Sequence, residues 1–144
     1  MENNKNYLNP EVMGWDSLIE DDGRGYLLLP EGDYGFEVVD FERDRFNGSA
    51  KLPACNKAVL TLAVETEEGT AHVRCDLLLC RALEWKLSSF FRSIGQKKKG
   101  ERVTMDWARV KGAHGRGHFR PKSYTDSNGS EHTVNECASF LDRD

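Results

Sequence analysis

The chain lacks the features that mark membrane, secreted and fibrous proteins. None of its apolar runs is longer than residues 77–80, whereas a helix that crosses a bilayer needs about 20 apolar residues. The first residues, MENNKN, contain no apolar signal-peptide core. Proline occurs only 4 times and glycine 13 times among 144 residues, which excludes collagen-like and low-complexity chains. We therefore expect a globular protein that makes no membrane contact and stays in the cytoplasm.

Motifs of metal centres and active sites are also missing. The chain has 4 cysteines, which are Cys55, Cys75, Cys80 and Cys137. None of them forms a C-x2-C pair, so we expect reduced thiols, no zinc site and no other metal or cofactor. There is no P-loop, nucleophile elbow or His-Glu-x-x-His motif. Asp40, Glu42 and Asp44 alternate along one segment, but Arg43 and Arg45 interrupt this acidic run. We therefore expect that the protein is not an enzyme.

The net charge of −4 conceals an uneven distribution along the chain. Residues 1–80 contain 7 basic and 16 acidic residues, whereas residues 81–144 contain 13 and 8. Within residues 81–125 the count is 12 basic to 3 acidic, and a field of this sign attracts phosphates. A solvated face that balances the acidic half explains the same numbers, so charge alone leaves both interpretations open.

Hydrophobic periodicity divides the chain into an arm and one domain. Residues 1–25 are polar and acidic, with at most a short helix within residues 11–19, and residues 26–144 form the domain. Alternating apolar residues predict strands at residues 34–41, around residues 60–64 and at residues 71–79. The period then changes to 3.6, because Leu83, Leu87, Phe90, Phe91 and Ile94 form one stripe of an amphipathic helix.

The rest of the chain completes a mainly β pattern. We predict a fourth strand at residues 102–110 and a fifth at residues 114–124, and the type of the closing element at residues 134–141 stays open. Three strands, one helix and two strands follow one another without the strand–helix alternation of a parallel sheet. This order matches a five-stranded, antiparallel OB-fold-like barrel with its helix between strands three and four.

Four short runs carry a family resemblance. They are LPEGDY at residues 29–34, KAVLTL at residues 57–62, WKL at residues 85–87 and FRSIG at residues 91–95. Together they resemble a family of small bacteriophage and prophage proteins that is often left as a domain of unknown function. Members with an assigned role are OB-fold proteins that bind single-stranded DNA and are encoded among replication and recombination genes. The resemblance covers residues 29–142 and implies the same role in a bacterial host cell, but it transfers no binding residue.

Binding of single strands without sequence preference needs a positive groove and aromatic side chains on which bases stack. The candidates are basic and aromatic residues that lie close together in the sequence: Arg43, Arg45, Phe46, Lys51, Lys57, Arg74, Trp107, Arg109, Lys111, Arg116, His118, Phe119, Arg120, Lys122 and Tyr124. In the fifth predicted strand, alternation places Arg116, His118, Arg120 and Lys122 on one face. Such groups repel one another unless anions lie across them. Either phosphates or the acidic arm at residues 16–22 would supply those anions.

Several of these residues also have a purely structural explanation. Phe90 and Phe91 belong to the helix stripe and to the core, Trp107 alternates with Val103 and favours a core position, and Phe119 fits either role. Gly115 and Gly117 permit the close approach of a ligand or mark a bulge in a coiled strand. Phe46, between arginines in a loop, is our preferred stacking residue.

Two partner classes follow from these observations. The first is single-stranded DNA, with phage recombination or replication proteins as further partners. The alternative is a protein–protein interaction module, either a host-factor inhibitor or an assembly subunit, because the OB-like scaffold does not itself specify a ligand. The sequence leaves homo-oligomerisation open. Residues 140–144 contain Phe140 but lack an acidic run, and we interpret them as the end of the domain.

Overall fold

The computed structural model describes residue 12, residues 14–16 and residues 27–142. The elements, in chain order, are β1 (Gly32–Phe46), β2 (Cys55–Thr66), β3 (Gly69–Leu78), the 3-10 turn η1 (Arg81–Leu83), α1 (Glu84–Ser93), the 3-10 turn η2 (Trp107–Arg109), β4 (His114–Thr125) and β5 (Glu131–Leu141). The structure confirms a mainly β chain with three strands before the helix and a strand at residues 114–125, but the second strand after the helix is not the one predicted. Most of the arm and of its predicted helix lies outside the described residues.

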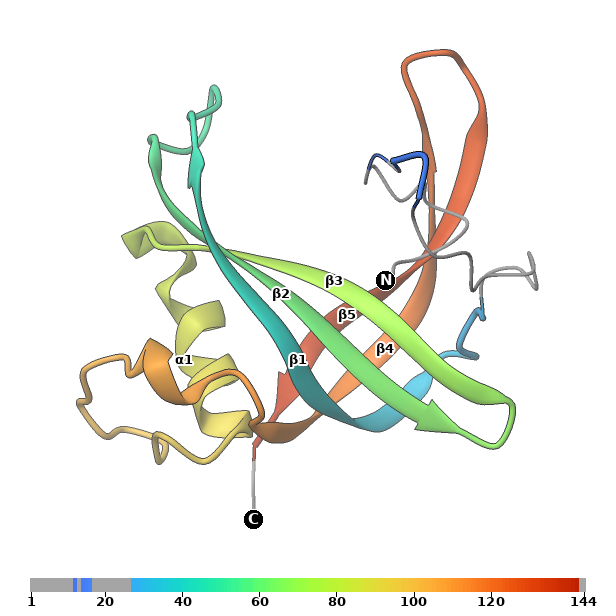
Figure 1. Cartoon of the computed structure of the whole chain (residues 1–144). Helices are drawn as coiled ribbons and strands as arrows, with labels where there is room; N and C mark the ends of the chain where they lie inside the picture. Colours follow the sequence, from blue (N-terminus) through green and yellow to red (C-terminus); the bar gives the residue numbers. More distant parts are fainter. Residues whose placement is uncertain (1–11, 13, 17–26, 143–144) are drawn as a thin grey trace.

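The five strands form one antiparallel sheet in the order β3-β2-β1-β4-β5. The sheet is strongly curled, so that β3 and β5 at its two edges come close to each other (Figure 1). No hydrogen-bonded ladder joins these two edges among the described residues. Within residues 27–142 no helix is long and apolar enough to cross a membrane.

The core lies between the inner face of the curled sheet and α1. Alternating residues of the strands enter it, and Val38, Leu62 and Val73 are each 0% exposed. From α1 the side chains of Leu87, Phe90 and Phe91 are buried, as the helix stripe predicts. The helix packs mainly against β5, with further contacts to β4 and β3.

Aromatic rings connect the helix to the sheet. Phe90 meets Phe140 edge-to-face at 5.1 Å between ring centroids, Phe36 meets Phe140 at 5.9 Å, and Phe36 meets Phe119 at 6.3 Å. Edge-to-face contacts of this kind stabilise a core beyond the apolar area that they bury. Phe119 is 0% exposed, so the prediction that it stacks on a base is wrong. It is a core residue.

The predicted strand at residues 102–110 is also wrong. Residues 101–106 have no regular structure, and Trp107–Arg109 form η2. Val103 and Met105, which suggested the alternation, are 40% and 37% exposed. The last strand of the sheet is instead Glu131–Leu141, the closing element whose type the sequence leaves open.

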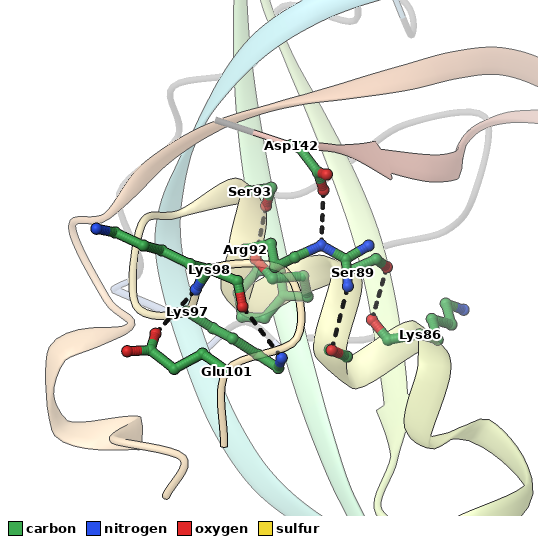
Figure 2. A network of polar contacts seen from close by, with 10 residues as sticks. Lys86, Ser89, Arg92, Ser93, Lys97, Lys98, Glu101 and Asp142 are labelled. Atoms are coloured by element: carbon green, nitrogen blue, oxygen red, sulfur yellow. Dashed lines mark hydrogen bonds and ion pairs between the residues drawn. The ribbon is translucent and has the colours of Figure 1, made fainter. Parts of the chain in front are cut away.

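The loop after α1 and the last described residues are both fixed by local polar contacts (Figure 2). Lys98 donates its backbone N–H to Glu101 Oε1 at 3.0 Å, and Lys97 Nζ donates to the Lys98 carbonyl at 3.3 Å. On the helix, Arg92 Nε donates to Asp142 Oδ1 at 2.7 Å. With Phe140 buried and Asp142 paired, the chain up to residue 142 belongs to the domain.

Gly115 and Gly117 of β4 serve packing. A Cβ on Gly115 would lie 2.8 Å from Phe36 Cζ and 2.9 Å from the Ser93 carbonyl oxygen at the end of α1. A Cβ on Gly117 would lie 3.0 Å from Cys137 Sγ. Both positions face the interior, and the adjacent pairing of β4 with β5 shifts register between His118 and Phe119. Of the two roles that the sequence allows, close approach by a ligand does not apply, since protein atoms already occupy these places.

Asn135 of β5 holds the segment that precedes β1. Its side chain is inside the protein at 4% exposure. Its Oδ1 accepts a hydrogen bond from the Leu29 N–H at 2.8 Å, and its Nδ2 donates to the Leu27 carbonyl at 2.9 Å. Leu29 is 1% exposed. The side-chain amide of Asn135 thus satisfies two backbone groups of a buried segment that is distant in the sequence.

We predict that Asn135→Ala lowers the free energy of unfolding by about 1–3 kcal/mol, because a buried backbone N–H loses its acceptor. Asn47→Ala, in the exposed loop after β1, is the control and should change that free energy by less than about 0.5 kcal/mol. Urea denaturation followed by circular dichroism measures both. Equal stability of the two variants would contradict the role given to Asn135.

Candidate nucleic-acid interface

The outer face of β4 carries the row of basic residues that strand alternation predicts. Arg116, His118, Arg120 and Lys122 alternate with the buried Gly117 and Phe119. Tyr124 continues the row and is 40% exposed. The sequence therefore predicts correctly which side chains share the outer face of β4. Whether this face requires phosphates to offset its positive charge depends on the groups that lie across it.

Carboxylates of this same chain lie across that face. His118 Nδ1 is 2.8 Å from Asp33 Oδ1, and His118 Nε2 is 3.0 Å from Glu31 Oε2. Glu136 of β5 accepts a hydrogen bond from Arg120 Nε at 2.9 Å and lies 3.1 Å from Lys122 Nζ. The anions that the sequence requires are thus supplied by the turn before β1, by β1 itself and by β5. Arg116 has no ion-pair partner among residues 27–142.

These contacts shift the protonation equilibria of the face. Hydrogen bonds that the imidazolium donates to Asp33 and Glu31 favour the charged form and raise the pKa of His118. Partial burial of Glu136 opposes its ionisation, but the hydrogen bonds from Arg120 and Lys122 outweigh it and lower the pKa of that carboxyl group. Arg120 and Lys122, two of the predicted binding residues, are therefore both paired with the carboxylate of Glu136.

The outer face of β1, β2 and β3 is acidic. Asp40, Glu42 and Asp44 share this face of β1. Lys57 Nζ lies 4.0 Å from Asp44 Oδ2 and 3.8 Å from Asp76 Oδ2. Arg74 makes two hydrogen bonds to Asp76, at 2.9 and 3.3 Å, and this side-chain hydrogen bonding contributes most to raising the pKa of Arg74. Lys57 and Arg74, both candidates from the sequence, therefore sit among carboxylates that repel phosphate.

The hairpin formed by β1 and β2 presents basic residues in a different setting. The guanidinium of Arg43 lies 5.3 Å from the Phe41 ring centroid, a cation–π contact. Arg45 Nη1 donates to Asn56 Oδ1 at 3.0 Å, and Lys51 is exposed in the connecting loop. Within residues 27–142 none of these three side chains has a carboxylate partner. Phe46, half-buried at the end of β1, lies opposite Cys55.

A column of rings leads from this hairpin to the core. Phe41 stacks on Trp107 with 5.2 Å between centroids and 11° between planes, and Trp107 meets Phe91 edge-to-face at 5.1 Å. Trp107 is half-buried and packs against the core, which agrees with the position that the sequence favours. Phe41 belongs to this column of rings, but it is not among the candidate residues chosen from the sequence. Its alternation with Arg43 and Arg45 is the signal that would have identified it.

Beyond η2, the turn that begins at Trp107 and ends at Arg109, the surface is hollowed by a depression of about 550 Å³ that Arg109 lines. Arg109, Lys111 and His114 line it, together with residues at the end of α1. The facing carboxylates are loosely placed, with Asp40 Oδ1 4.0 Å from Lys111 Nζ and Glu37 Oε1 3.8 Å from His114 Nε2. The structure therefore brings Arg109 and Lys111 together, as their spacing in the sequence suggests.

Tyr124 lies apart from that surface, near the end of β4. Its ring stacks on His132 of β5 at 5.2 Å between centroids and 28° between planes. His132 Nε2 is 2.6 Å from Asp126 Oδ2, and this contact lowers the pKa of Asp126. The sequence does not indicate His132, because it lies opposite Tyr124 only through the strand register.

All four cysteines are free, and burial raises the pKa of the Cys75 thiol to about 11. In the described part of the chain no three His, Cys, Asp or Glu side chains are grouped to hold a metal ion. No protein-family model matches the chain, and no curated protein matches it. The geometry of the surface is therefore the basis for any functional conclusion.

We predict that protonation of His118 stabilises the fold. Because its pKa is raised in the folded state, the stabilisation is fully present below the ordinary value of about 6.5 and is lost as the pH rises through the raised pKa. Thermal unfolding between pH 5.5 and pH 8.5 should show a smaller loss of stability with rising pH in His118→Gln than in the unchanged protein. Arg116→Gln, on the same face, should keep the original pH profile. A profile that His118→Gln leaves unaltered would show that the two carboxylates do not bind the imidazolium.

Proposed function

We propose that this protein is an OB-fold-like single-stranded-DNA-binding protein. The order β3-β2-β1-β4-β5 places β1 between the two halves of the sheet and brings the two edges near each other. The helix falls between β3 and β4 and packs against β5, β4 and β3. A barrel of the OB type has this strand order and this position for its helix. This agreement supports the proposal and does not require a hydrogen-bonded ladder between β3 and β5.

The proposed contact region is the hairpin–Trp107 surface. It comprises Phe41, Arg43, Arg45, Phe46, Lys51, Trp107, Arg109 and Lys111. The observation that carries the proposal is the contrast in how cations are paired. On the β4 face and on the β1–β3 face, carboxylates lie as close as 2.8–2.9 Å to the basic groups. On the hairpin–Trp107 surface, Arg43, Arg45 and Lys51 have no carboxylate partner within residues 27–142, and only Lys111 faces a carboxylate, that of Asp40 at 4.0 Å.

This contrast matters because a phosphate gains little from a cation that already has a carboxylate partner. Displacing a tight intramolecular pair costs about what the new contact contributes. Unpaired guanidinium and ammonium groups instead exchange only water and counterions for the strand, which gives a favourable, salt-dependent contribution. Half-buried aromatic side chains beside such groups provide faces for bases, and unpaired bases are accessible only in single strands.

The role that fits best is sequence-tolerant coating of replication or recombination intermediates. Its exposed cations and aromatic rings suit the phosphates and base faces that every strand presents, whatever its sequence. A phage or prophage origin, and recombination or replication proteins as partners, follow from the family resemblance and form part of the same proposal.

A protein–protein interaction module is the second candidate. Trp85 on α1 is 65% exposed, and tryptophans are enriched at the centres of protein interfaces. The acidic face of β1–β3 would suit a basic partner. Salt-dependent oligonucleotide binding separates the two candidates, since an interaction module should bind DNA weakly at every ionic strength.

We predict that Arg43→Gln combined with Arg45→Gln weakens binding to labelled oligothymidine. The log–log salt slope should become shallower by about 0.7 for each phosphate that is no longer neutralised. The matched control is Lys57→Gln combined with Arg74→Gln, which also removes two positive charges from β-strands. It should leave affinity unchanged, because those cations lie among carboxylates. Fluorescence anisotropy at several salt concentrations measures both variants.

The control must lose no more stability than the test variant, as checked by thermal unfolding. Equal decreases of affinity in the two variants would show that net charge, not the hairpin–Trp107 surface, governs binding. Binding to blunt duplex that equals or exceeds binding to single strands would contradict the proposed function itself.

We also predict that Phe46→Ala weakens single-strand binding by about 1–3 kcal/mol while stability changes little, because this half-buried ring is placed to stack on a base. Phe91→Ala should do the opposite and lower stability by about 3–5 kcal/mol, since its ring is 2% exposed in the core. If Phe46→Ala unfolds the protein and leaves the affinity of the folded fraction intact, Phe46 is structural.

A further inference from the structure

The depression combines the side chains of Arg109, Lys111 and His114 with a backbone that hydrogen bonds hold in place. Arg109 and Lys111 flank Val110, which is 0% exposed, and both line the surface around it. Gly112 donates its N–H to the Val38 carbonyl at 2.7 Å, and Val38 donates to the Ala113 carbonyl at 2.9 Å. These two hydrogen bonds join residues 112–113 to β1. The backbone next to Lys111 and His114 is therefore held in place.

The residues just after α1 form another wall of the depression, and three carbonyl groups of the last turn of α1 already accept hydrogen bonds. Ile94, Gly95 and Gln96 donate their N–H groups to the carbonyls of Phe90, Arg92 and Phe91. The negative end of a helix repels anions through unpaired carbonyls, so this capping reduces the repulsion. Gly95 and Gly112 both have positive φ, at 84° and 92°, and carry no side chain into the space.

The charges around the depression suit an anion with two negative charges. Arg109 has no carboxylate partner within residues 27–142. Lys111 and His114 face Asp40 and Glu37 at only 4.0 and 3.8 Å, and their side chains are 66% and 71% exposed. Pairs as exposed as these contribute little, and an incoming anion can replace them. Apart from Ile94 and Ala113 the lining is polar, charged or glycine, so the site offers contacts to charge and little surface to a base.

We propose that this depression binds a phosphomonoester group, and specifically the terminal phosphate of a DNA strand that lies on the hairpin–Trp107 surface. The source of the phosphate rests on the proposed function, because Arg109 and Lys111, which line the depression, also belong to the hairpin–Trp107 surface. A terminal phosphate carries more negative charge than an internal phosphodiester, so it gains more from Arg109 and Lys111, which both line the depression. The protein thereby distinguishes a phosphorylated strand end from a hydroxyl end.

The test compares oligothymidines that differ only at one end. Anisotropy is measured for 5′-phosphate against 5′-hydroxyl strands labelled at the 3′ end, and for 3′-phosphate against 3′-hydroxyl strands labelled at the 5′ end. We expect the phosphorylated strand of one pair to bind about fivefold more tightly, which is what two partly exposed ion contacts supply. Arg109→Gln should reduce this ratio toward one. The matched control Arg116→Gln, which removes an exposed arginine on β4 instead, should preserve it.

Inorganic phosphate provides a second arm that needs no DNA. At constant ionic strength, phosphate should raise Tm relative to chloride in the unchanged protein and less so in Arg109→Gln. Strands that bind with no preference for either phosphorylated end would overturn the inference and leave the proposed function standing. Phosphate-dependent stabilisation that requires Arg109, without binding of any strand, would support the depression as a site for free phosphate and refute the proposed function. Absence of both effects would refute both.

Discussion

The absence of a side chain at Gly115 is the constraint on which the packing of this molecule depends. β4 lies between β1 and β5 in the sheet and also passes the end of α1. Only a residue without Cβ lets the strand meet the Ser93 carbonyl and the Phe36 ring at the same point. The helix can therefore lie close against the inner face of the sheet, where Phe90 and Phe140 fill the space. The placement of β4 also determines where its outer row of basic residues stands.

Cross-strand register then decides which charges are available to a ligand. Asp33 is the direct partner of His118, Glu136 of Arg120, and Asp44 of Lys57. Opposite charges that face each other across neighbouring strands stabilise the sheet, and they also neutralise two of its surfaces. The positions on either side of Asp44 in β1 differ, because the register partners of Arg43 and Arg45 are Ala58 and Asn56, which carry no charge. The side chains of Arg43 and Arg45 are thus left without a carboxylate partner in the register.

Most elements could be predicted from the sequence because each has a clear period of two or 3.6 residues. The prediction failed at residues 102–110, where Val103 and Met105 alternate but Gln96, not a neighbouring strand, bonds the backbone of Asp106. β5 stayed undecided because its register with β4 skips Ala138, and this bulge sends both Cys137 and Phe140 inward at a spacing of three. The ion pairs of His118 could not be predicted from the sequence, because its partners Glu31 and Asp33 are far from it along the chain and only the strand pairing brings them together.

The two hydrogen bonds of Asn135 have a consequence for the order in which the chain folds. β5 is the last of the described strands, yet it holds Leu27 and Leu29, which precede β1. During synthesis on the ribosome, the backbone of Leu27 and Leu29 can form these two hydrogen bonds only after Asn135 has been synthesised. Contacts of such long sequence separation slow folding, and until β5 emerges the nascent sheet exposes the inward faces of β1–β3 and of β4. The demand for chaperones should therefore be greatest just before β5 is synthesised.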